Sequence, residues 1–447
     1  MGTEQAKEEF KKQPEKKLKP ERQEAKSAKN KLIKAINYLD TKYDFRYNVI
    51  NTDTEYRLKK VEDKPEEDFR FYDDRDYKDL YLELKLADLG LSDQDFKTVC
   101  YSSKLSEAYD PFKTYLYSLD KWDGKTDYIK NFLQQVYLKN EEDRQYFVDG
   151  FKKWFTALVV SLLEDVPSMY FINQTCLVLS GGQGKYKTTF LQSLVPKELQ
   201  LKYFYGSSFQ VHNKDHEKYL AYKIIINFDE MAAFNKTDIE SLKAKITQSQ
   251  VVLRLPYGKA DVHLKRRASF TATQNNKEFL RDDTGSRRWF VIEVENIALD
   301  PSANIDNLYK QALGMYREGF QYWFDNADIK KLEAHNEQYH LKGIEEELVL
   351  KHLELPTKIQ MDENSNLIEY MSATDLGNFF GEKYNKLNVN STFVKNIGTC
   401  LGKLGFQKRS RRLNKNSDTV KLWAIIRVLE PQNFSVDGHG EIKNDIF

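Results

Sequence analysis

Several features that mark particular classes of protein are scarce in this chain of 447 residues. Its three cysteines, Cys100, Cys176 and Cys400, are far apart in sequence, which argues against a disulfide framework and a zinc site. No run approaches the roughly 18 consecutive apolar residues of a membrane span. The first residues, MGTEQAKEEFKK, lack the apolar segment of a secretory signal. We therefore expect a cytoplasmic protein without a membrane partner.

A net charge of one sign is also missing. The chain has 69 Lys and Arg residues and 68 Asp and Glu residues, so its formal charge is +1. This balance excludes a uniformly basic nucleic-acid coat and a strongly acidic tail protein, but it permits a nucleic-acid binder whose charges are segregated. At roughly 150 residues per domain, the length predicts about two to four domains.

The distribution of apolar residues divides the chain into five parts. Residues 1–30 are mostly Lys, Glu and Gln, so we expect a disordered charged tail. Residues 31–110 predict a small, mostly helical domain, and residues 111–325 predict a large α/β domain. Residues 343–430 combine helices, a basic turn and a last strand, which is typical of a winged-helix domain. Residues 431–447 predict a second tail.

The fold class is predicted by the middle part, where short apolar runs alternate with helical patterns. The runs CLVLS, KIIINFDE, ASFTATQN and WFVIEV predict four buried strands, which begin at residues 176, 223, 268 and 289. Buried strands separated by helices indicate an α/β fold with a mainly parallel sheet and flanking helices.

A glycine-rich run follows the first predicted strand and opens a helix. It consists of Gly181, Gly182, Gln183, Gly184, Lys185, Tyr186, Lys187, Thr188 and Thr189. In a P-loop, glycines let backbone N–H groups surround phosphate oxygens, a lysine reaches the β- and γ-phosphates, and a hydroxyl group binds Mg²⁺. Lys187 fits the lysine position because Thr188 follows it, whereas Lys185 precedes a tyrosine. The run therefore predicts a site for ATP and Mg²⁺.

Tyr186 stands where the P-loop pattern normally has glycine. The sequence leaves two outcomes open. Either Tyr186 adopts the backbone conformation that the loop needs, or the loop is distorted and its affinity for nucleotide is reduced. The second outcome would favour a protein that binds ATP but hydrolyses it weakly.

Polar side chains end the next two predicted strands. Asp229 and Glu230 follow the second strand, and we expect them to support Mg²⁺ and to polarise the attacking water, respectively. Asn275 follows the third strand and could orient that water. A helix cap and a solvated turn are the alternatives for these residues taken singly. Because the carboxyl ends of parallel strands meet at one edge of a sheet, the three side chains are expected beside Lys187.

Two arginines, Arg287 and Arg288, precede the fourth predicted strand. In ring-shaped ATPases an arginine from the neighbouring subunit stabilises the charge of the transition state, with an effect of about 10³–10⁵ on the rate. Either arginine could take this role, and ordinary surface charge is the alternative.

In this order, the motifs GGQGKYKTT, INFDE, LRLPYGK, RRASFTATQNN and TGSRRW resemble the virulence-associated protein E family, which is related to superfamily 3 helicases within the AAA+ ATPases. The resemblance covers about residues 111–325. It implies an ATP-dependent DNA helicase for the replication of a phage, prophage or other mobile genetic element, working as a hexamer-like homo-oligomeric ring. It also implies a possible primase partner, although no primase domain is visible in the sequence.

The resemblance also assigns roles to residues. Lys187 and Thr188 match Walker A, Asp229 and Glu230 match Walker B, and Asn275 matches sensor 1. The matched arginine pair is Arg287 and Arg288.

Basic residues at two further places predict contacts with DNA. Superfamily 3 helicases carry a basic hairpin between Walker B and sensor 1, where this chain has Arg254, Tyr257 and Lys259, followed by three more basic residues at 265–267. Cations beside an aromatic ring suit single-stranded DNA. The second cluster, at the basic turn of the winged-helix-like part, consists of Lys408, Arg409, Arg411 and Arg412. A solvated hairpin and a solvated loop are the alternatives.

A second function from a different class stays open. Tyr186 and the basic C-terminal turn are also compatible with a DNA-binding regulator or origin-recognition protein that binds nucleotide and hydrolyses it weakly or not at all. Turnover of ATP and unwinding of a forked duplex distinguish this alternative from a helicase.

Overall fold

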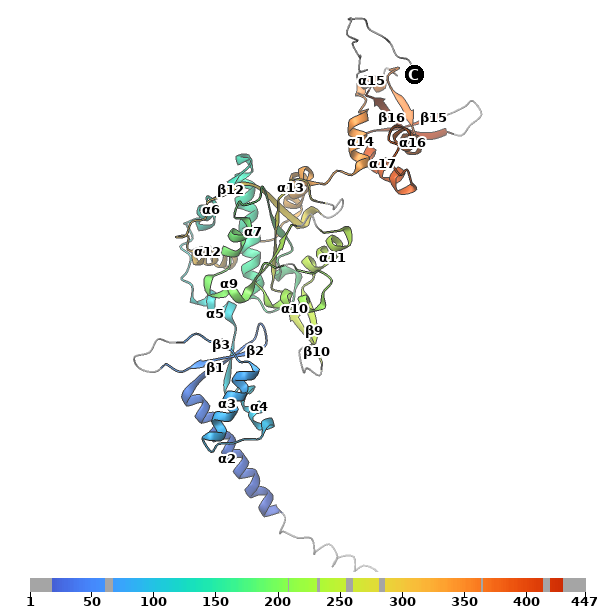
Figure 1. Cartoon of the computed structure of the whole chain (residues 1–447). Coiled ribbons are helices and arrows are strands. Elements are labelled where there is room, and N and C mark those ends of the chain that lie inside the picture. The colour runs from blue at the N-terminus through green and yellow to red at the C-terminus, as the bar shows by residue number, and fades with distance from the viewer. Residues whose placement is uncertain are drawn as a thin grey trace, which may run out of the picture. The chain divides into compact units, whose positions relative to one another are not determined.

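A computed structural model of the chain describes residues 18–60, 67–207, 209–230, 234–254, 260–280, 286–362, 365–412 and 419–428. It forms two compact units, Met1–Tyr339 and His340–Phe447, each of which is described by itself below (Figure 1). The chain is a mixed α/β protein with several sheets, as the sequence predicted. Within these ranges, every helix is too short or too polar to span a bilayer.

The first unit begins with a small α/β layer. Its helices are α2 (Leu18–Lys42), α3 (Asp74–Leu86) and α4 (Asp93–Cys100). Its sheet has the order β3-β2-β1-β4 and consists of β1 (Tyr43–Asn48), β2 (Asp53–Leu58), β3 (Arg70–Phe71) and β4 (Ser106–Tyr109). For this segment the sequence predicts a mostly helical domain with a strand or two. The structure adds a four-stranded sheet because buried aromatic residues such as Phe45 and Tyr56 stack between neighbouring strands.

The predicted N-terminal tail is partly helical. Residues 18–30 form the first half of α2, while residues 1–17 and the second predicted tail, 431–447, lie outside the described residues. Lys, Glu and Ala favour helix, and the second half of α2 buries Ala35 and Leu39 against the small layer. A helix anchored by this packing extends into a charged segment that has no apolar face of its own.

The small layer joins the rest of the first unit through polar contacts. The Asn48 side chain donates a hydrogen bond of 2.7 Å to the hydroxyl of Tyr203. Lys202 pairs at 2.8 Å with Glu55, whose side chain is only 2 % exposed. These contacts connect β1 and β2 to the helix α9 (Lys197–Tyr203).

A six-stranded sheet of order β5-β12-β6-β11-β8-β7 forms the centre of the first unit. Its strands are β5 (Val136–Leu138), β6 (Cys176–Ser180), β7 (Phe204–Tyr205), β8 (Ile225–Asp229), β11 (Ser269–Gln274) and β12 (Trp289–Ile297). All neighbouring strands pair in parallel, except β5, which pairs antiparallel with β12. The carboxyl ends of the five parallel strands therefore share one edge.

Helices cover both faces of this sheet. Leu177 and Leu179 of β6 belong to one buried cluster, and Cys176 and Val178 belong to the other. The uninterrupted apolar run of β6 reflects this burial on both faces. The helices are α5 (Pro111–Ser118), α6 (Tyr128–Leu133), α7 (Arg144–Leu163), α8 (Lys187–Ser193), α9, α10 (Lys214–Tyr222), α11 (Lys236–Thr247), α12 (Ile305–Arg317) and α13 (Asn326–Asn336). Short 3-10 turns include η3 (Met169–Phe171) and η5 (Ser286–Arg288).

A separate antiparallel hairpin consists of β9 (Gln250–Arg254) and β10 (Asp261–Lys265). Figure 1 shows it projecting from the part of the unit that holds α10. Tyr257 and Lys259, between its two strands, lie outside the described residues.

The basic residues at the end of the hairpin, 265–267, point inward. Arg266 is fully buried and donates four hydrogen bonds to backbone oxygens, those of Gln248 (2.8 Å), Ala268 (2.5 Å), Asn173 (2.9 Å) and Ile246 (2.9 Å). Lys265 donates to the backbone oxygen of Glu164, and burial lowers the pKa of Lys265 to about 7. Arg267 lies 3.7 Å from Asp165. The expected basic stretch therefore contributes to the foot of the hairpin and not to an outward surface.

The second unit combines helices with a small sheet. Its helices are α14 (Ile344–His352), α15 (Lys358–Asp362), α16 (Ala373–Lys383) and α17 (Ser391–Lys403). Its strands are β13 (Leu353–Glu354), β14 (Glu369–Met371), β15 (Lys408–Arg412) and β16 (Thr419–Arg427), and β16 pairs with each of the others. Phe380, Ile397 and Ile425 are buried in its core.

We predict that Arg266→Met lowers the free energy of unfolding by about 3 kcal/mol, because four backbone acceptors lose a charged donor. Urea unfolding followed by tryptophan fluorescence measures the change, since Trp154 and Trp289 are buried in the same unit. Arg317→Met, on the exposed face of α12, is the matched control and should stay within about 0.5 kcal/mol of the wild type. Equal effects of the two substitutions would contradict a structural role for Arg266.

Candidate functional site

The residues of the predicted phosphate site meet at the carboxyl edge of the large sheet. Lys187 begins α8 directly after the glycine-rich loop, Asp229 ends β8, and Asn275 follows β11. Together with Gln183 to Thr189, Glu230 and Thr273, they line a cavity of about 590 Å³. Parallel pairing brings residues that are more than 80 positions apart in sequence to one place, since Lys187 and Asn275 are in contact.

Lys187 lies at the floor of this cavity. It is only 6 % exposed, and its Nζ donates to the backbone oxygens of Gly181 and Gly182, both at 2.7 Å. A third bond of 3.1 Å goes to Oδ1 of Asn275. Burial, and secondarily the nearby charge of Lys185, lower the pKa of Lys187. The loop therefore holds one positive charge where phosphate oxygens would enter.

Asp229 is held in one orientation by three donors. Its Oδ1 accepts hydrogen bonds from the side chains of Asn227 (2.7 Å), Thr273 (2.9 Å) and Thr188 (3.2 Å). Asn227 is itself fixed by a 2.9 Å bond from Thr271. Sequence reasoning missed Asn227, Thr271 and Thr273, although polar residues at these positions of buried strands were a usable signal.

The donor set fits Mg²⁺ better than a metal held by protein alone. In the described ranges there is no group of three or more His, Cys, Asp or Glu side chains that could enclose an ion. Mg²⁺ typically uses one or two protein oxygens together with substrate phosphates and water. The Thr188 hydroxyl and the Asp229 carboxylate, 3.2 Å apart, supply hard oxygen ligands of this kind.

Asn275 connects the lysine to the second carboxylate. Its Nδ2 lies 3.4 Å from Oε1 of Glu230, while its Oδ1 contacts Lys187. Glu230 has a φ of 57°, in the left-handed region, and its backbone N–H donates to Thr273 at 3.0 Å. Such a backbone costs roughly 1–3 kcal/mol. The fold stabilises this strained position at the edge of the cavity.

Tyr186 resolves the question left by the sequence. Its φ of 56° and ψ of 21° are left-handed, which is the conformation that glycine adopts most easily. Its backbone oxygen accepts a 2.9 Å bond from Phe190, so α8 begins normally behind it, and its ring is 60 % exposed. Tyr186 therefore adopts the conformation that the loop needs.

Gly181 is required by a close approach. Its φ is 155°, and a Cβ at this position would lie 2.3 Å from the backbone oxygen of Val294. Gly184 also has a positive φ, 77°, but nothing lies within 4 Å of the position of its Cβ. The two glycines thus have different physical roles in the same loop.

Arg287 and Arg288 lie away from this cavity. They form η5 immediately before Trp289, which pairs in parallel with Cys176 at the amino end of β6. Lys187 follows the carboxyl end of β6, so the arginine pair and the lysine lie at opposite edges of the sheet. The arginines line a second cavity of about 450 Å³.

The residues predicted to contact DNA are distributed over both units. In the first unit, Arg254 ends β9 and is exposed. In the second unit, Lys408 lies 4.5 Å above the ring of Trp423, and Arg411 donates a 2.7 Å bond to the hydroxyl of Tyr370. The remaining predicted residues are Arg409, exposed on β15, and Arg412, whose side chain lies outside the described residues.

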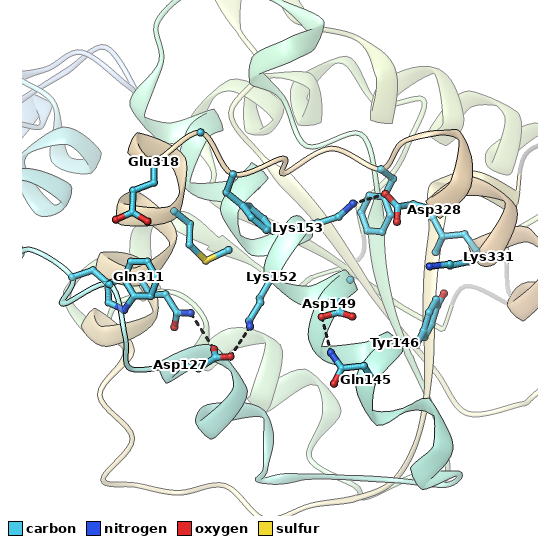
Figure 2. A pocket seen from close by; sticks show the side chains of 18 of the residues that line it. Asp127, Gln145, Tyr146, Asp149, Lys152, Lys153, Gln311, Glu318, Asp328 and Lys331 are labelled. Carbon is cyan, nitrogen blue, oxygen red and sulfur yellow. Dashed lines mark hydrogen bonds and ion pairs between the residues drawn. The ribbon is translucent and has the colours of Figure 1, made fainter.

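A larger cavity of the first unit, about 900 Å³, lies elsewhere, between α7, α12 and the start of α13. Figure 2 shows its central charges directed at one another: Lys152 contacts Asp127 at 2.5 Å, and Lys153 contacts Asp328. Gln311 donates to Asp127 at 3.0 Å. The central charges of this cavity are thus paired with one another. The smaller cavity at the sheet edge instead holds the groups that suit phosphate chemistry.

We predict that Gly181→Ala lowers the free energy of unfolding by roughly 2–3 kcal/mol, because the new Cβ forces the loop away from Val294. Gly184→Ala should cost only about 1 kcal/mol, the strain of a left-handed alanine. Thermal unfolding of both variants measures the difference, and ATP affinity should fall more in Gly181→Ala. A larger loss in Gly184→Ala would contradict the loop geometry.

Comparisons with known proteins support one family. A family model described as the virulence-associated protein E-like domain matches residues 116–341, just over half of the chain. A search of curated proteins finds no match. Among solved structures, the chain is similar to the apo structure of the NrS-1 C terminal region, with 13 % identity, a TM-score of 0.43, and coverage of 88 % of this chain and 97 % of that chain. The A form apo structure of the same region has 11 % identity and a TM-score of 0.46, with coverage of 88 % of this chain and 98 % of that chain. On the family match, the chain belongs to the virulence-associated protein E-like family.

Proposed function

We propose that this protein hydrolyses ATP to work on DNA, as a helicase in the replication of a phage, prophage or other mobile genetic element. The observation that carries the proposal is the meeting of Lys187, Thr188, Asp229, Glu230 and Asn275 at one sheet edge. A P-loop ATPase of the AAA+ type needs these groups at this place. Family membership supports the same assignment.

In this proposal the glycine-rich loop and Lys187 bind the phosphates of ATP. The lysine exchanges its bonds to Gly181 and Gly182 for the β- and γ-phosphate oxygens. Thr188 and Asp229 would hold Mg²⁺, which when bound neutralises phosphate charge. The three donors on Asp229 keep its carboxylate beside Thr188 before substrate arrives.

Glu230 and Asn275 act on the water that attacks the γ-phosphate. Glu230 polarises the water as a base, and Asn275 orients it while contacting Lys187. Because Asn275 contacts both groups, the lysine and the base are held in a fixed relation. This arrangement contributes positioning, which supplies much of the rate enhancement in phosphoryl transfer.

The charge of the transition state calls for an arginine from a second copy of the chain. Among the described residues that line the phosphate cavity there is no arginine. Arg287 and Arg288 lie at the opposite edge of the sheet, so neither reaches the phosphates of its own copy. A contact between opposite edges of two copies is head-to-tail, and such contacts close into rings when the rotation permits. A hexamer-like ring is therefore part of the proposal.

DNA is the proposed partner of both units. The β9–β10 hairpin, which carries Arg254, would track the backbone of a single strand. In the second unit, α16, α17 and the β15–β16 pair follow the order of a winged-helix domain, with Arg409 and Arg411 on β15. Their side chains would contact phosphates. A primase partner remains part of the proposal by family resemblance.

A nucleotide-binding regulator of DNA is the second candidate. The exposed ring of Tyr186 lines the phosphate cavity and is the specific observation that favours it. ATP binding without turnover in the wild-type protein, with or without single-stranded DNA, would select this candidate over the ATPase.

We predict that Lys187→Ala reduces Mg²⁺-dependent ATP turnover at least about 100-fold, because one preorganised charge at the phosphates is lost. Lys197→Ala is the matched control, since it removes an exposed lysine that does not line the phosphate cavity, and its turnover should stay within about fivefold of the wild type. Phosphate release with saturating single-stranded DNA is the measurement. Retained turnover in Lys187→Ala would overturn the site assignment.

We predict that two inactive variants restore each other when mixed. Lys187→Ala lacks the phosphate lysine, and the double variant Arg287→Ala, Arg288→Ala lacks the second-copy arginine. Random mixing should recover roughly a quarter of wild-type turnover, because each complete site combines an intact edge from each variant. A mixture of Lys187→Ala with Glu230→Gln, which damage the same edge, should recover nothing. Absence of recovery in the first mixture would contradict an arginine acting between copies.

A further inference from the structure

A second cavity opens at the amino edge of the large sheet. It has a volume of about 450 Å³ and is lined by aromatic side chains together with the arginine pair. We call it the aromatic cavity and define it by Tyr170, Tyr322, Trp323, Phe324, Arg287 and Arg288. A cavity of this size suits one small organic ligand or one unit of a polymer.

Two of the rings around the aromatic cavity are exposed. Tyr170 is 81 % exposed and Trp323 is 56 % exposed, unusual values for large aromatic side chains. Tyr322 is buried: its hydroxyl donates a 2.7 Å bond to the backbone oxygen of Tyr170, and its ring lies edge-on to Trp323 at 5.5 Å. Tyr322 therefore links the backbone that carries Tyr170 to the ring of Trp323, so both exposed rings lie at one cavity.

The charge of the aromatic cavity is positive. Two arginines line it, and none of the described lining residues is an acid. Arg287 is exposed and forms no ion pair or hydrogen bond with any residue of the described ranges. An exposed guanidinium beside exposed aromatic rings matches a ligand that has both a flat ring and an anionic group.

The position of the aromatic cavity points to DNA. Thr247, the last residue of α11, lines it, and β9 of the hairpin begins three residues later at Gln250. The cavity therefore lies at the foot of the hairpin that is proposed to track a single strand. A strand that passes along the hairpin would bring bases and phosphates to the rings and to Arg287.

We propose that the aromatic cavity binds one nucleotide of single-stranded DNA. Its base stacks on Trp323 and Tyr170, and its phosphate pairs with Arg287. This inference rests on the proposed function only in taking DNA as the partner. It also divides the arginine pair, because Arg287 serves DNA and the transition-state role between copies falls to Arg288, which is half-buried.

The test measures binding of a fluorescein-labelled oligo(dT) by anisotropy, without ATP, to the full chain. Trp323→Ala and Tyr170→Ala should each weaken binding roughly tenfold, as expected for the loss of one stacked base. Arg287→Ala should weaken binding and reduce its dependence on salt. Tyr117→Ala, which removes another exposed ring, and Arg317→Ala, on α12, are matched controls and should bind like the wild type.

Crosslinking separates DNA from the other possible occupants. Oligonucleotide containing 5-iodouracil should crosslink to Tyr170 or Trp323 under ultraviolet light. Unchanged DNA affinity in both Trp323→Ala and Tyr170→Ala would overturn the proposal. So would a change of sedimentation in Trp323→Ala and Tyr170→Ala at unchanged DNA affinity, which would indicate a contact between copies. Because no ATP is present, Lys187→Ala should bind the oligonucleotide like the wild type. Failure of the ATPase assignment would therefore appear in the turnover assay and not in this binding test.

Discussion

Backbone hydrogen bonds between β11 and its two parallel neighbours, β6 and β8, fix the geometry on which the proposed chemistry depends. Gln274 pairs with Ser180 and Thr273 pairs with Asp229, so all three strands end at one level of the sheet. The glycine-rich loop, the two carboxylates and Asn275 each lie at the carboxyl end of one of these strands. A shift of one residue in this register would turn Asp229 to the other face of the sheet and separate it from Thr188.

Two non-glycine residues beside this edge, Tyr186 and Glu230, have left-handed backbones. Each is stabilised by a bond to a regular element: the Tyr186 oxygen accepts from the first turn of α8, and the Glu230 N–H donates to Thr273 of β11. The sheet and helix thus compensate the cost of the strained residues locally. Strain concentrated at a cavity of this chemistry accords with a site that is organised before its ligand binds.

Basic residues have two different roles in the first unit: some are buried and stabilise the fold, and others are exposed. Lys265, Arg266 and Arg267 look in sequence like a basic surface, but their contacts to backbone oxygens and to Asp165 fix the foot of the β9–β10 hairpin. Arg287, in contrast, is exposed beside aromatic rings. The near-neutral total conceals this division, because a count of charges does not record which side chains are buried.

The sequence by itself determined the mixed α/β class, the family resemblance and the identity of the residues that meet at the sheet edge. These features depend on local patterns: apolar runs that end in polar residues, and glycines before a lysine and a threonine. Only the tertiary structure decided the rest. The support of Asp229 by Asn227 and Thr273, the conformation of Tyr186, the burial of Arg266 and the aromatic cavity around Trp323 arise from contacts between segments far apart in the chain. Such contacts are set by strand pairing and packing, which leave no periodic signal in any one segment.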